Sequence, residues 1–331
     1  PPLSLETEQA LNEISKCRVI GLTLETRPDD INQQECIRLR RFGCTRVQIG
    51  VQHIDDGILR YNNRGCTNQD TITAIRLLKY YCFKVDIHIM PDLPGSSPDA
   101  DRRMFDIILT DPDYQVDHHK WYPCVVTPHS LIKRWYDEGT YKPYAERDNN
   151  KTLFEILADA YMCAPPWIRI NRIFRDIPLH EIEGGCNNPS IRQDLDKYLE
   201  ERGLKPSEIR SREVRNRRYE RSDVELVVRQ FQSSGSPEYF ISFEDTRQNL
   251  LLGFCRLRIE RDNSYHLIRS LRNTAYIREL HVYGAISNSK SRRDIKNQRE
   301  AQTRTQLTQS QGYGRRLVKE AERIAIYNHN N

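Results

Sequence analysis

The stretch TRVQIGVQHIDDGILRYNNRGCTNQDTITAIRLLKYYCFKVDIHIM, residues 45–90, decides how the first half of this chain folds. It begins and ends with strand-like runs at 45–51 and 84–90, and apolar residues recur at helical spacing over 68–81 between them. A strand, a helix and a second strand joined by short connections predict two parallel strands covered by a helix.

The same alternation extends on both sides of this stretch, from residue 17 to about residue 175. Further strands are expected at 19–25, 116–122 and 167–173, and further helices at 31–42, 98–111 and 150–162. We therefore expect an α/β fold, either a barrel or an open parallel sheet. In such folds the chemistry lies at the carboxyl ends of the strands, which here means the residues at 25–29, 52–53, 90–95 and 121–123.

The pattern changes after residue 178. One helix is expected at 190–202, an arginine-dense segment follows, and four strand-like runs separated by polar turns lie at 224–231, 238–245, 249–260 and 275–284. A final helix is expected at 315–326. The sequence thus predicts a first domain at 1–178, a basic linker at 179–222 and an α+β domain at 223–331.

Composition sets broad limits on the class of protein. The 331 residues carry a formal net charge of +5, and 29% are charged. No apolar run approaches the roughly 18 residues that a membrane helix needs, so no membrane partner is expected. The nine cysteines are scattered without a Cys-x-x-Cys pair, which is typical of reduced, buried thiols in the cytosol.

A glycine turn at Gln311-Gly312-Tyr313-Gly314 leads directly into the final helix. Glycines let the backbone approach a ligand closely, and the first amides of a helix suit a pyrophosphate. Taken alone, such a turn is more often only a tight turn. The order strand, loop, glycine turn and helix is that of a GNAT-type acetyltransferase core, and a Rossmann interpretation fits less well because the preceding strands are antiparallel in style.

Ten blocks of this sequence resemble, in order, the family of Elongator catalytic subunits. They include GLTLETRPD, FGCTRVQIGVQ, FKVDIHIMPDLPGSSP, PPWIRINRIFRDIP, RELHVYG and QGYGRRLVKEAERIA, and the resemblance runs from about residue 17 to the end. It implies a radical-SAM (β/α) barrel followed by a GNAT-type acetyltransferase domain. It also implies modification of the wobble uridine of tRNA, with acetyl-CoA, S-adenosylmethionine and a 4Fe-4S cluster as cofactors. The implied partners are tRNA and other Elongator subunits, and the implied location is the cytoplasm, with the nucleus also open.

The resemblance carries site residues over by position. Along the coenzyme arm it places Glu279, Leu280, His281 and Val282, and around the pyrophosphate Gln311, Gly312, Tyr313, Gly314, Arg315 and Arg316. In the S-adenosylmethionine and uridine cavity it places Glu25, Arg27, Gln52 and Met90. The alternative for these four is ordinary polar pairing at the rim, with Glu25 and Arg27 as a surface ion pair. No catalytic residue is assigned.

Departures from the family pattern set further expectations. The family's Cys-x9-Cys-x2-Cys-type loop has no counterpart, so the cluster ligands are not expected in this chain. The tyrosine-bearing segment expected after the coenzyme helix is also missing, so both domains are expected to be incomplete. Ser211 stands where a linker thiol occurs in some members, and Cys66 where histidine is usual. His118 and His119 point to opposite faces of a strand, so no metal is predicted.

Basic residues on both sides of the predicted domain junction favour tRNA binding, because guanidinium groups grip phosphates and stack on bases. The predicted RNA-binding residues are Arg169, Arg172, Arg175, Arg210, Arg212, Arg215, Arg217 and Arg218, and the loop 286–304 joins them. The alternative is a solvated, salt-bridged linker, because Glu208, Glu213 and Glu220 are interleaved. Two other functions stay open: a protein lysine acetyltransferase, and a noncatalytic tRNA-binding or assembly module.

Overall fold

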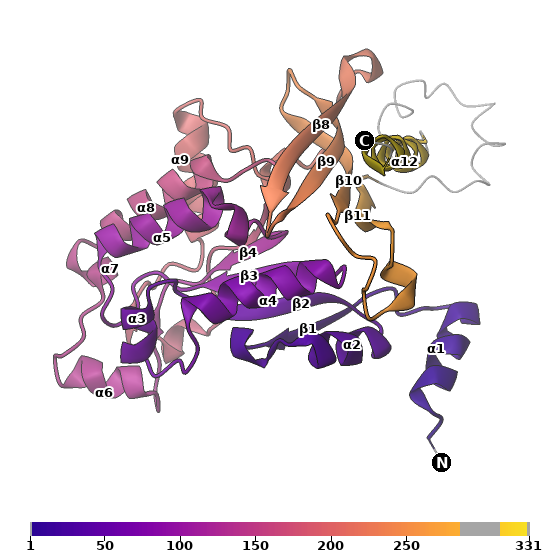
Figure 1. Cartoon of the computed structure of the whole chain (residues 1–331). Helices are drawn as coiled ribbons and strands as arrows, with labels where there is room; N and C mark the ends of the chain where they lie inside the picture. The colour runs from indigo at the N-terminus through magenta and orange to yellow at the C-terminus, as the bar shows by residue number, and fades with distance from the viewer. Residues whose placement is uncertain (1, 285–311, 330–331) are drawn as a thin grey trace. The chain divides into compact units, whose positions relative to one another are not determined.

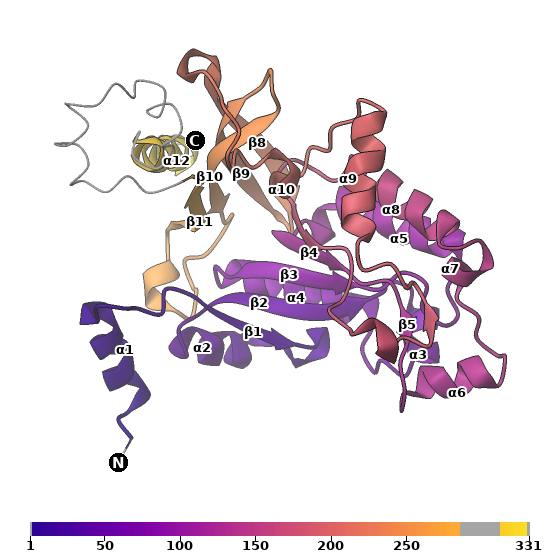
Figure 2. The same cartoon turned by 180° about the vertical axis from the view of Figure 1, so that it is seen from behind.

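The computed structural model describes residues 2–284 and 312–329. The chain divides into two compact units, a parallel-sheet unit (1–163 and 170–203) and an antiparallel-sheet unit (164–169 and 204–331), which can be followed in Figures 1 and 2. This division differs from the predicted boundaries at 178 and 222. The segment 179–203 joins the first unit because helix α9 (Ile191–Glu201) buries Ile191, Leu195 and Leu199 and packs on α8 (Lys151–Cys163). The remainder of the predicted linker joins the second unit.

The parallel-sheet unit contains one five-stranded sheet in the order β1-β2-β3-β4-β6. The strands are β1 (Leu22–Thr26), β2 (Cys44–Gln52), β3 (Lys84–Ile89), β4 (His118–Trp121) and β6 (Arg169–Arg172). Strands β1 to β4 pair in parallel. All five strands that the sequence predicts in this region are confirmed.

Five helices of this unit were also expected from the sequence: α2 (Gln33–Arg41), α4 (Asn68–Tyr80), α5 (Pro98–Thr110), α8 and α9. Capping residues determine where two of these helices begin. Thr67 and Asp70 form a capping box on α4, and Ser97 caps α5 ahead of Pro98. Helices α2 and α4 pack on β2 and β3 (Figure 1). They cover the apolar face of the sheet, which Val47, Ile49, Val85 and Ile87 provide.

Several short elements of this unit were not predicted. They are α1 (Leu5–Ile14), α3 (Asp56–Tyr61), α6 (Leu131–Asp137), α7 (Tyr144–Arg147) and the small antiparallel pair β5 (Val125–Val126) and β7 (Gly184–Gly185). Most of them lie in the connections that follow the carboxyl ends of the strands. These connections supply part of the site described below.

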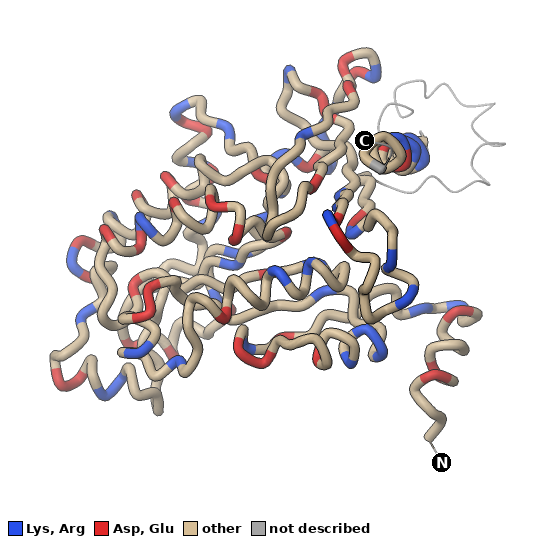
Figure 3. Tube along the Cα trace, in the orientation of Figure 1, with Lys and Arg blue, Asp and Glu red and all other residues tan. Residues whose placement is uncertain are grey.

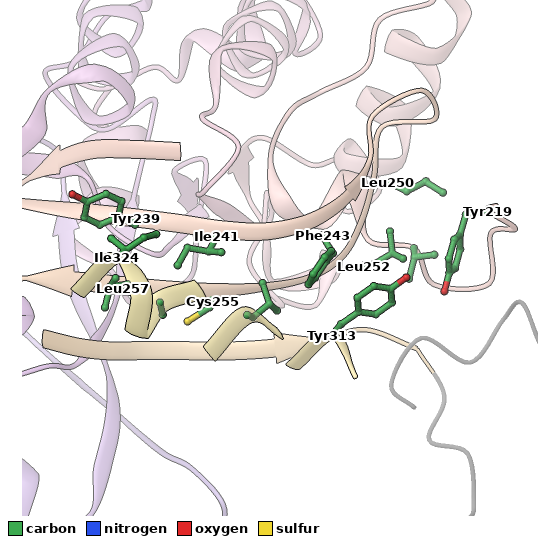
Figure 4. Close-up of a cluster of buried hydrophobic side chains, with 13 residues drawn as sticks. Tyr219, Tyr239, Ile241, Phe243, Leu250, Leu252, Cys255, Leu257, Tyr313 and Ile324 are labelled. Atoms are coloured by element: carbon green, nitrogen blue, oxygen red, sulfur yellow. The ribbon is translucent and has the colours of Figure 1, made fainter. Parts of the chain in front are cut away.

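The antiparallel-sheet unit has the strand order β11-β10-β9-β8. Its elements are α10 (Ile209–Arg212), β8 (Val224–Ser233), β9 (Ser236–Asp245), β10 (Leu250–Ile259), β11 (Ala275–Val282) and α12 (Tyr313–His329). Figure 4 shows its core, where Ile241 and Phe243 of β9 and Leu257 of β10 face Tyr313 and Ile324 of α12. The four predicted strands and the final helix are thereby confirmed.

The expected fold class, a parallel α/β sheet followed by an α+β unit, is thus the fold of this chain. Among the described residues no helix combines the length and the apolar character that crossing a membrane requires.

Candidate functional site

One face of the parallel sheet carries a row of polar side chains. Strand register places Glu25 beside Gln48, Gln48 beside Asp86 and Asp86 beside His118. One step toward the carboxyl ends, His88 lies beside Lys120. Because side chains alternate along a strand, all of these residues share the face opposite the apolar one.

A cavity of about 550 Å³ opens at the carboxyl ends of these strands. Its lining includes Glu25 from β1, Gln52 at the end of β2, His88 and Met90 from β3 and its end, and Lys120 from β4. Its polar and aromatic lining also includes Asn62, Arg64, Tyr122, Trp135, Arg172, Arg175 and Asp176. The volume lies within the range of small-molecule and cofactor sites.

His88 connects the polar row to the cavity. Its Nδ1 lies 3.5 Å from Glu25 Oε1, and its Nε2 lies 3.3 Å from Gln48 Oε1. The Lys120 ammonium donates to the same Gln48 oxygen at 2.7 Å, so this oxygen acts as an acceptor and His88 Nε2 must carry hydrogen. The His88 ring also meets Tyr122 edge-on, with 5.5 Å between the ring centroids.

Burial and charge shift the acid–base properties of these groups. Burial and the nearby Lys120 lower the pKa of His88, while Glu25 opposes the shift. Burial also lowers the pKa of Lys120. Deeper in the sheet, burial raises the pKa of Asp86 but His118 and Arg46 outweigh it, so this carboxyl stays below its ordinary value. A buried carboxylate thus compensates the cations beneath the cavity.

Three of the four residues predicted for this cavity, Glu25, Gln52 and Met90, do line it. Arg27 is not part of the lining. Its guanidinium instead forms an ion pair with Asp29 at 2.5 Å and faces the Gly65 carbonyl. The alternative pairing of Glu25 with Arg27 is also replaced, because Glu25 lies against His88.

Gln48, His88 and Lys120 were not predicted as site residues. A signal for them was present, because in VDIHIM the residues Asp86, His88 and Met90 fall on one face at a period of two. His118 and His119 do point to opposite faces, as predicted. His118 lies 3.0 Å from Asp86, whereas His119 is buried beside Trp121, and burial lowers its pKa to about 3.

Strand β11, predicted to lie along a coenzyme arm, is the last strand in the order of the antiparallel sheet. Leu280 is 44% exposed. Glu279 pairs with Arg256 at 2.9 Å, and the His281 ring lies 4.3 Å from that of Tyr283.

The predicted phosphate turn is described in part. Gln311 and the loop 286–304 lie outside the described residues. Gly312 has a φ of +79°, and a Cβ built on Gly314 would meet Val282 at 3.6 Å, so the turn lies against the end of β11. Tyr313 points into the core, with its ring 4.6 Å from that of Phe243. Its amide, not its side chain, is therefore what this turn could offer a phosphate, beside the exposed Arg315 and Arg316.

The arginines predicted to bind RNA have different surroundings. Arg212 is 2% exposed, pairs with Glu244 at 3.0 Å and donates to the Pro166 carbonyl, so it stabilises the antiparallel-sheet unit and is withdrawn from the RNA-binding set. Arg169 pairs with the mostly buried Glu213. Arg217 donates to the carbonyls of Ser211 and Glu213, and burial lowers its pKa.

The remaining predicted RNA-binding arginines are more open. Arg215 and Arg218 are exposed, and Arg210 is partly exposed. Arg172 and Arg175 line the cavity of the parallel-sheet unit, and Arg172 pairs with Asp176. Figure 3 shows basic and acidic residues interspersed over both units. Arg169 and Arg215 both form ion pairs with Glu213. For Arg215 this supports the alternative of a salt-bridged linker.

Comparison of this chain with known proteins identifies related families and structures. A model described as the Radical SAM superfamily matches residues 1–106, and one described as the Radical_SAM C-terminal domain matches residues 116–201. A tRNA uridine(34) acetyltransferase of Methanocaldococcus infernus is 38% identical over 97% of this chain and 58% of its own length. The solved structure of the archaeal Methanocaldococcus infernus Elp3 with an N-terminal deletion (1–46) is 36% identical, covering 99% of this chain and 75% of that one, with a TM-score of 0.85.

This chain belongs to the Elongator complex protein 3 family. Elongator complex protein 3 of Schizosaccharomyces pombe is likewise 34% identical over 98% of this chain and 58% of its own length. The chain therefore spans a little over half the length of these two curated relatives. The family resemblance expected from the ordered sequence blocks is confirmed.

Radical SAM family membership implies a 4Fe-4S cluster, and the described part of the chain does not fit one. No group of three or more His, Cys, Asp or Glu side chains there could hold a metal ion. Among the cysteines, Cys36, Cys44, Cys66, Cys124, Cys186 and Cys255 are buried singly as small apolar groups. Cys66, which stands where the family usually has histidine, follows this pattern, and burial raises the pKa of its thiol.

Proposed function

We propose that this chain carries the S-adenosylmethionine cavity and the coenzyme-binding unit of an Elongator-type tRNA wobble-uridine modifying acyltransferase. The observation that carries the proposal is the cavity at the carboxyl ends of β1 to β4, lined by Glu25, Gln52 and Met90, in a chain of the Elongator complex protein 3 family. A relative is named tRNA uridine(34) acetyltransferase, which supports the same reaction here.

The cavity residues fit a nucleoside bearing charged groups. Arg172, Arg175 and Lys120 supply positive charge for a carboxylate or phosphate, and Glu25 and Gln52 offer hydrogen-bond acceptors. Tyr122 and Trp135 supply aromatic surface for a base. The proposed role of these residues is to bind and orient S-adenosylmethionine. The described residues do not fit the cluster whose electron the cleavage of S-adenosylmethionine to a radical requires.

The antiparallel-sheet unit fits acetyl-CoA. Residues Glu279–Val282 of β11 would lie along the extended arm, and the amides at Gly312–Gly314 would face the pyrophosphate. Arg315 and Arg316, exposed on the first turn of α12, would add positive charge. The partners proposed for the whole protein are tRNA and other Elongator subunits, in the cytoplasm and the nucleus.

Two assays test the proposal. Acetyl-CoA turnover should be stimulated by tRNA and not by a lysine peptide; peptide acetylation independent of tRNA would instead support a lysine acetyltransferase. Binding of S-adenosylmethionine should be lost when Gln52 or Met90 is replaced by a bulky residue. If tRNA binds while acetyl-CoA and S-adenosylmethionine do not, the chain is a noncatalytic tRNA-binding module and the proposal is wrong.

A further inference from the structure

A buried polar cluster adjoins the cavity-lining residues in sequence without lining the cavity itself. Its members are His53, Asp92, Asp101 and Tyr144, each at most 4% exposed. His53 follows the lining residue Gln52, and Asp92 lies between the lining residues Met90 and Leu93. The cluster is therefore one or two peptide bonds away from three residues that line the cavity, Gln52, Met90 and Leu93.

The Asp101 carboxylate is the centre of this cluster. Its Oδ2 accepts from the Asp92 backbone N–H at 2.6 Å and from the Tyr144 hydroxyl at 2.7 Å. Its Oδ1 accepts from the Ser96 hydroxyl at 2.6 Å and lies 3.2 Å from His53 Nε2. The Asp55 backbone N–H donates to His53 Nδ1 at 2.9 Å, which leaves the ring hydrogen on Nε2, aimed at Asp101. One side chain of α5 thus joins the two cavity loops and helix α7.

The joined loops adopt unfavourable backbone conformations. Gln52 has a φ of 68° and Asp92 a φ of 65°. A non-glycine residue in this region costs on the order of 1 kcal/mol or more and persists where its surroundings enforce it. Between these two residues in space, the Met90 backbone N–H donates to the Gln52 carbonyl at 2.7 Å. The backbone conformation around Met90 therefore depends on the hydrogen bonds of the buried cluster centred on Asp101.

We propose that Asp101 is a positioning residue for this cavity. Its hydrogen bonds hold Gln52, Met90 and Leu93 in the arrangement that the bound nucleoside requires, and Asp101 does not touch that ligand. The inference deepens the proposed function and rests on it for the ligand, S-adenosylmethionine. The arrangement of the walls themselves is independent of which ligand binds.

The methionines of the chain allow a direct test. There are three, at positions 90, 104 and 162, so 13C-methyl spectra give one signal from the cavity wall (Met90), one from α5 (Met104) and one from α8 (Met162). Asp101→Asn is compared with Asp117→Asn. Asp117 is equally buried and accepts from the Val85 N–H at 2.9 Å, at the opposite end of β3 from the cavity.

We expect Asp101→Asn to move and broaden the Met90 signal and to weaken S-adenosylmethionine binding about tenfold, the scale on which small misplacements act. Asp117→Asn should leave both readouts unchanged while lowering the melting temperature. If Asp101→Asn lowers the melting temperature but leaves the Met90 signal and the affinity unchanged, the cluster is only structural and the inference is wrong.

Two further arms keep the test decisive. If Asp101→Asn does not fold, Tyr144→Phe removes one of the hydrogen bonds to Asp101 and should still move the Met90 signal; an unchanged signal would contradict the inference. If the unmodified chain does not bind S-adenosylmethionine, the proposed function fails. In that case the positioning role is still tested by comparing the Met90 signals of Asp101→Asn and Asp117→Asn. A Met90 signal that moves only in Asp101→Asn supports the role, and one that moves in neither variant contradicts it.

Discussion

Two groups of buried charged and polar side chains, one in each sheet of this chain, differ in their partners. In the antiparallel sheet a buried carboxylate meets guanidinium groups at close range: Glu238 lies 3.0 Å from Arg258 and 2.6 Å from Arg278. In the parallel sheet His88 and Lys120 converge on one uncharged amide oxygen of Gln48. Their remaining surfaces face a cavity, together with Glu25.

This contrast separates charges that build structure from charges that are available to a ligand. A closed ion pair has its partners within the fold, and removing one leaves the other uncompensated. Polar groups that converge on a cavity with part of their hydrogen-bonding capacity directed into it are suited to binding. Substitutions in the two sheets should therefore have opposite signatures, with loss of stability in one and loss of binding in the other.

The largest effect is expected at Glu238. Glu238→Ala leaves the buried Arg258 and Arg278 without this carboxylate, and removing one member of a buried ion pair costs about 3–5 kcal/mol. Urea unfolding measures the loss, with Glu225→Ala on the exposed side of β8 as the control. A loss below about 1 kcal/mol would show that the pairs in this sheet do not carry structural weight.

The next effect concerns Asp92, whose pKa burial raises to about 7. The folded protein keeps this proton where the unfolded chain has lost it, so its contribution to stability falls as pH rises between about 4 and 7, by at most about 1.4 kcal/mol per pH unit. Asp92→Asn removes this titration, so its stability should fall less than that of the unmodified chain as pH rises over that range. Its amide nitrogen also replaces one of the two oxygens that accept from the Tyr144 and Ala145 N–H groups, which sets a loss of stability that does not depend on pH. Parallel stability curves for the two proteins from pH 4 to 8 would contradict this.

At the glycine turn, Gly314→Arg should abolish acetyl-CoA binding, because a large side chain blocks close approach of the backbone. The expected penalty exceeds the roughly 1.4 kcal/mol that corresponds to a tenfold loss. Gly314→Ala is the matched control, since its Cβ would make only ordinary contact with Val282. Calorimetry with acetyl-CoA measures both variants, and retained binding by Gly314→Arg would refute the phosphate role of the turn.

A smaller effect, on tRNA affinity, is expected for basic residues of the segment 179–222, which the sequence predicted to be a linker. Replacing Arg215, Arg217 and Arg218 with alanine should weaken tRNA binding and reduce its salt dependence by about one unit of slope for each phosphate that is no longer neutralised. The inward donors of Arg217 make it the weakest contributor of the three. A salt titration that matches the unmodified chain and an Arg38→Ala control would remove this surface from the RNA site.

The smallest effect concerns the proton balance of the cavity. Glu25 raises the pKa of His88 against the lowering by burial and Lys120, so Glu25→Gln should lower that pKa further, by a small amount because Glu25 is largely exposed. Histidine NMR over pH 4–8 measures it. Asp176→Asn, in the same cavity, serves as the control and should leave the titration in place.

Most of the fold could be predicted from the sequence, because local sequence patterns indicate the strands of both sheets. The alternation of apolar and polar residues in KVDIHIM, the caps at Thr67 and Ser97 and the strand-like runs after residue 224 all depend on near neighbours. The division at 163–170 and 203 does not, because it depends on which surface α9 packs against. Helix α6 and the small pair β5–β7 were missed for the same reason.

The site was predictable only where a residue's place on a strand decides its role. Glu25, Gln52 and Met90 stand at strand ends, where the rule for parallel sheets directs attention, and the family resemblance singled them out within those segments. His88 and Lys120 required the register between strands, which sequence spacing does not supply. Arg212 and Arg217 looked like RNA-binding residues because composition shows charge but not its partners.

The central claim is that the polar face of the parallel sheet forms a binding site for S-adenosylmethionine. The most direct test is a titration of the unmodified chain with S-adenosylmethionine, followed through the three methionine methyl signals. Met90 lines the cavity, whereas Met104 is buried in α5 and Met162 lies on α8. A saturable shift of the Met90 signal, with Met162 unmoved, is the predicted result. A Met90 signal that stays in place at saturating ligand, or that moves no more than Met162, would contradict the claim.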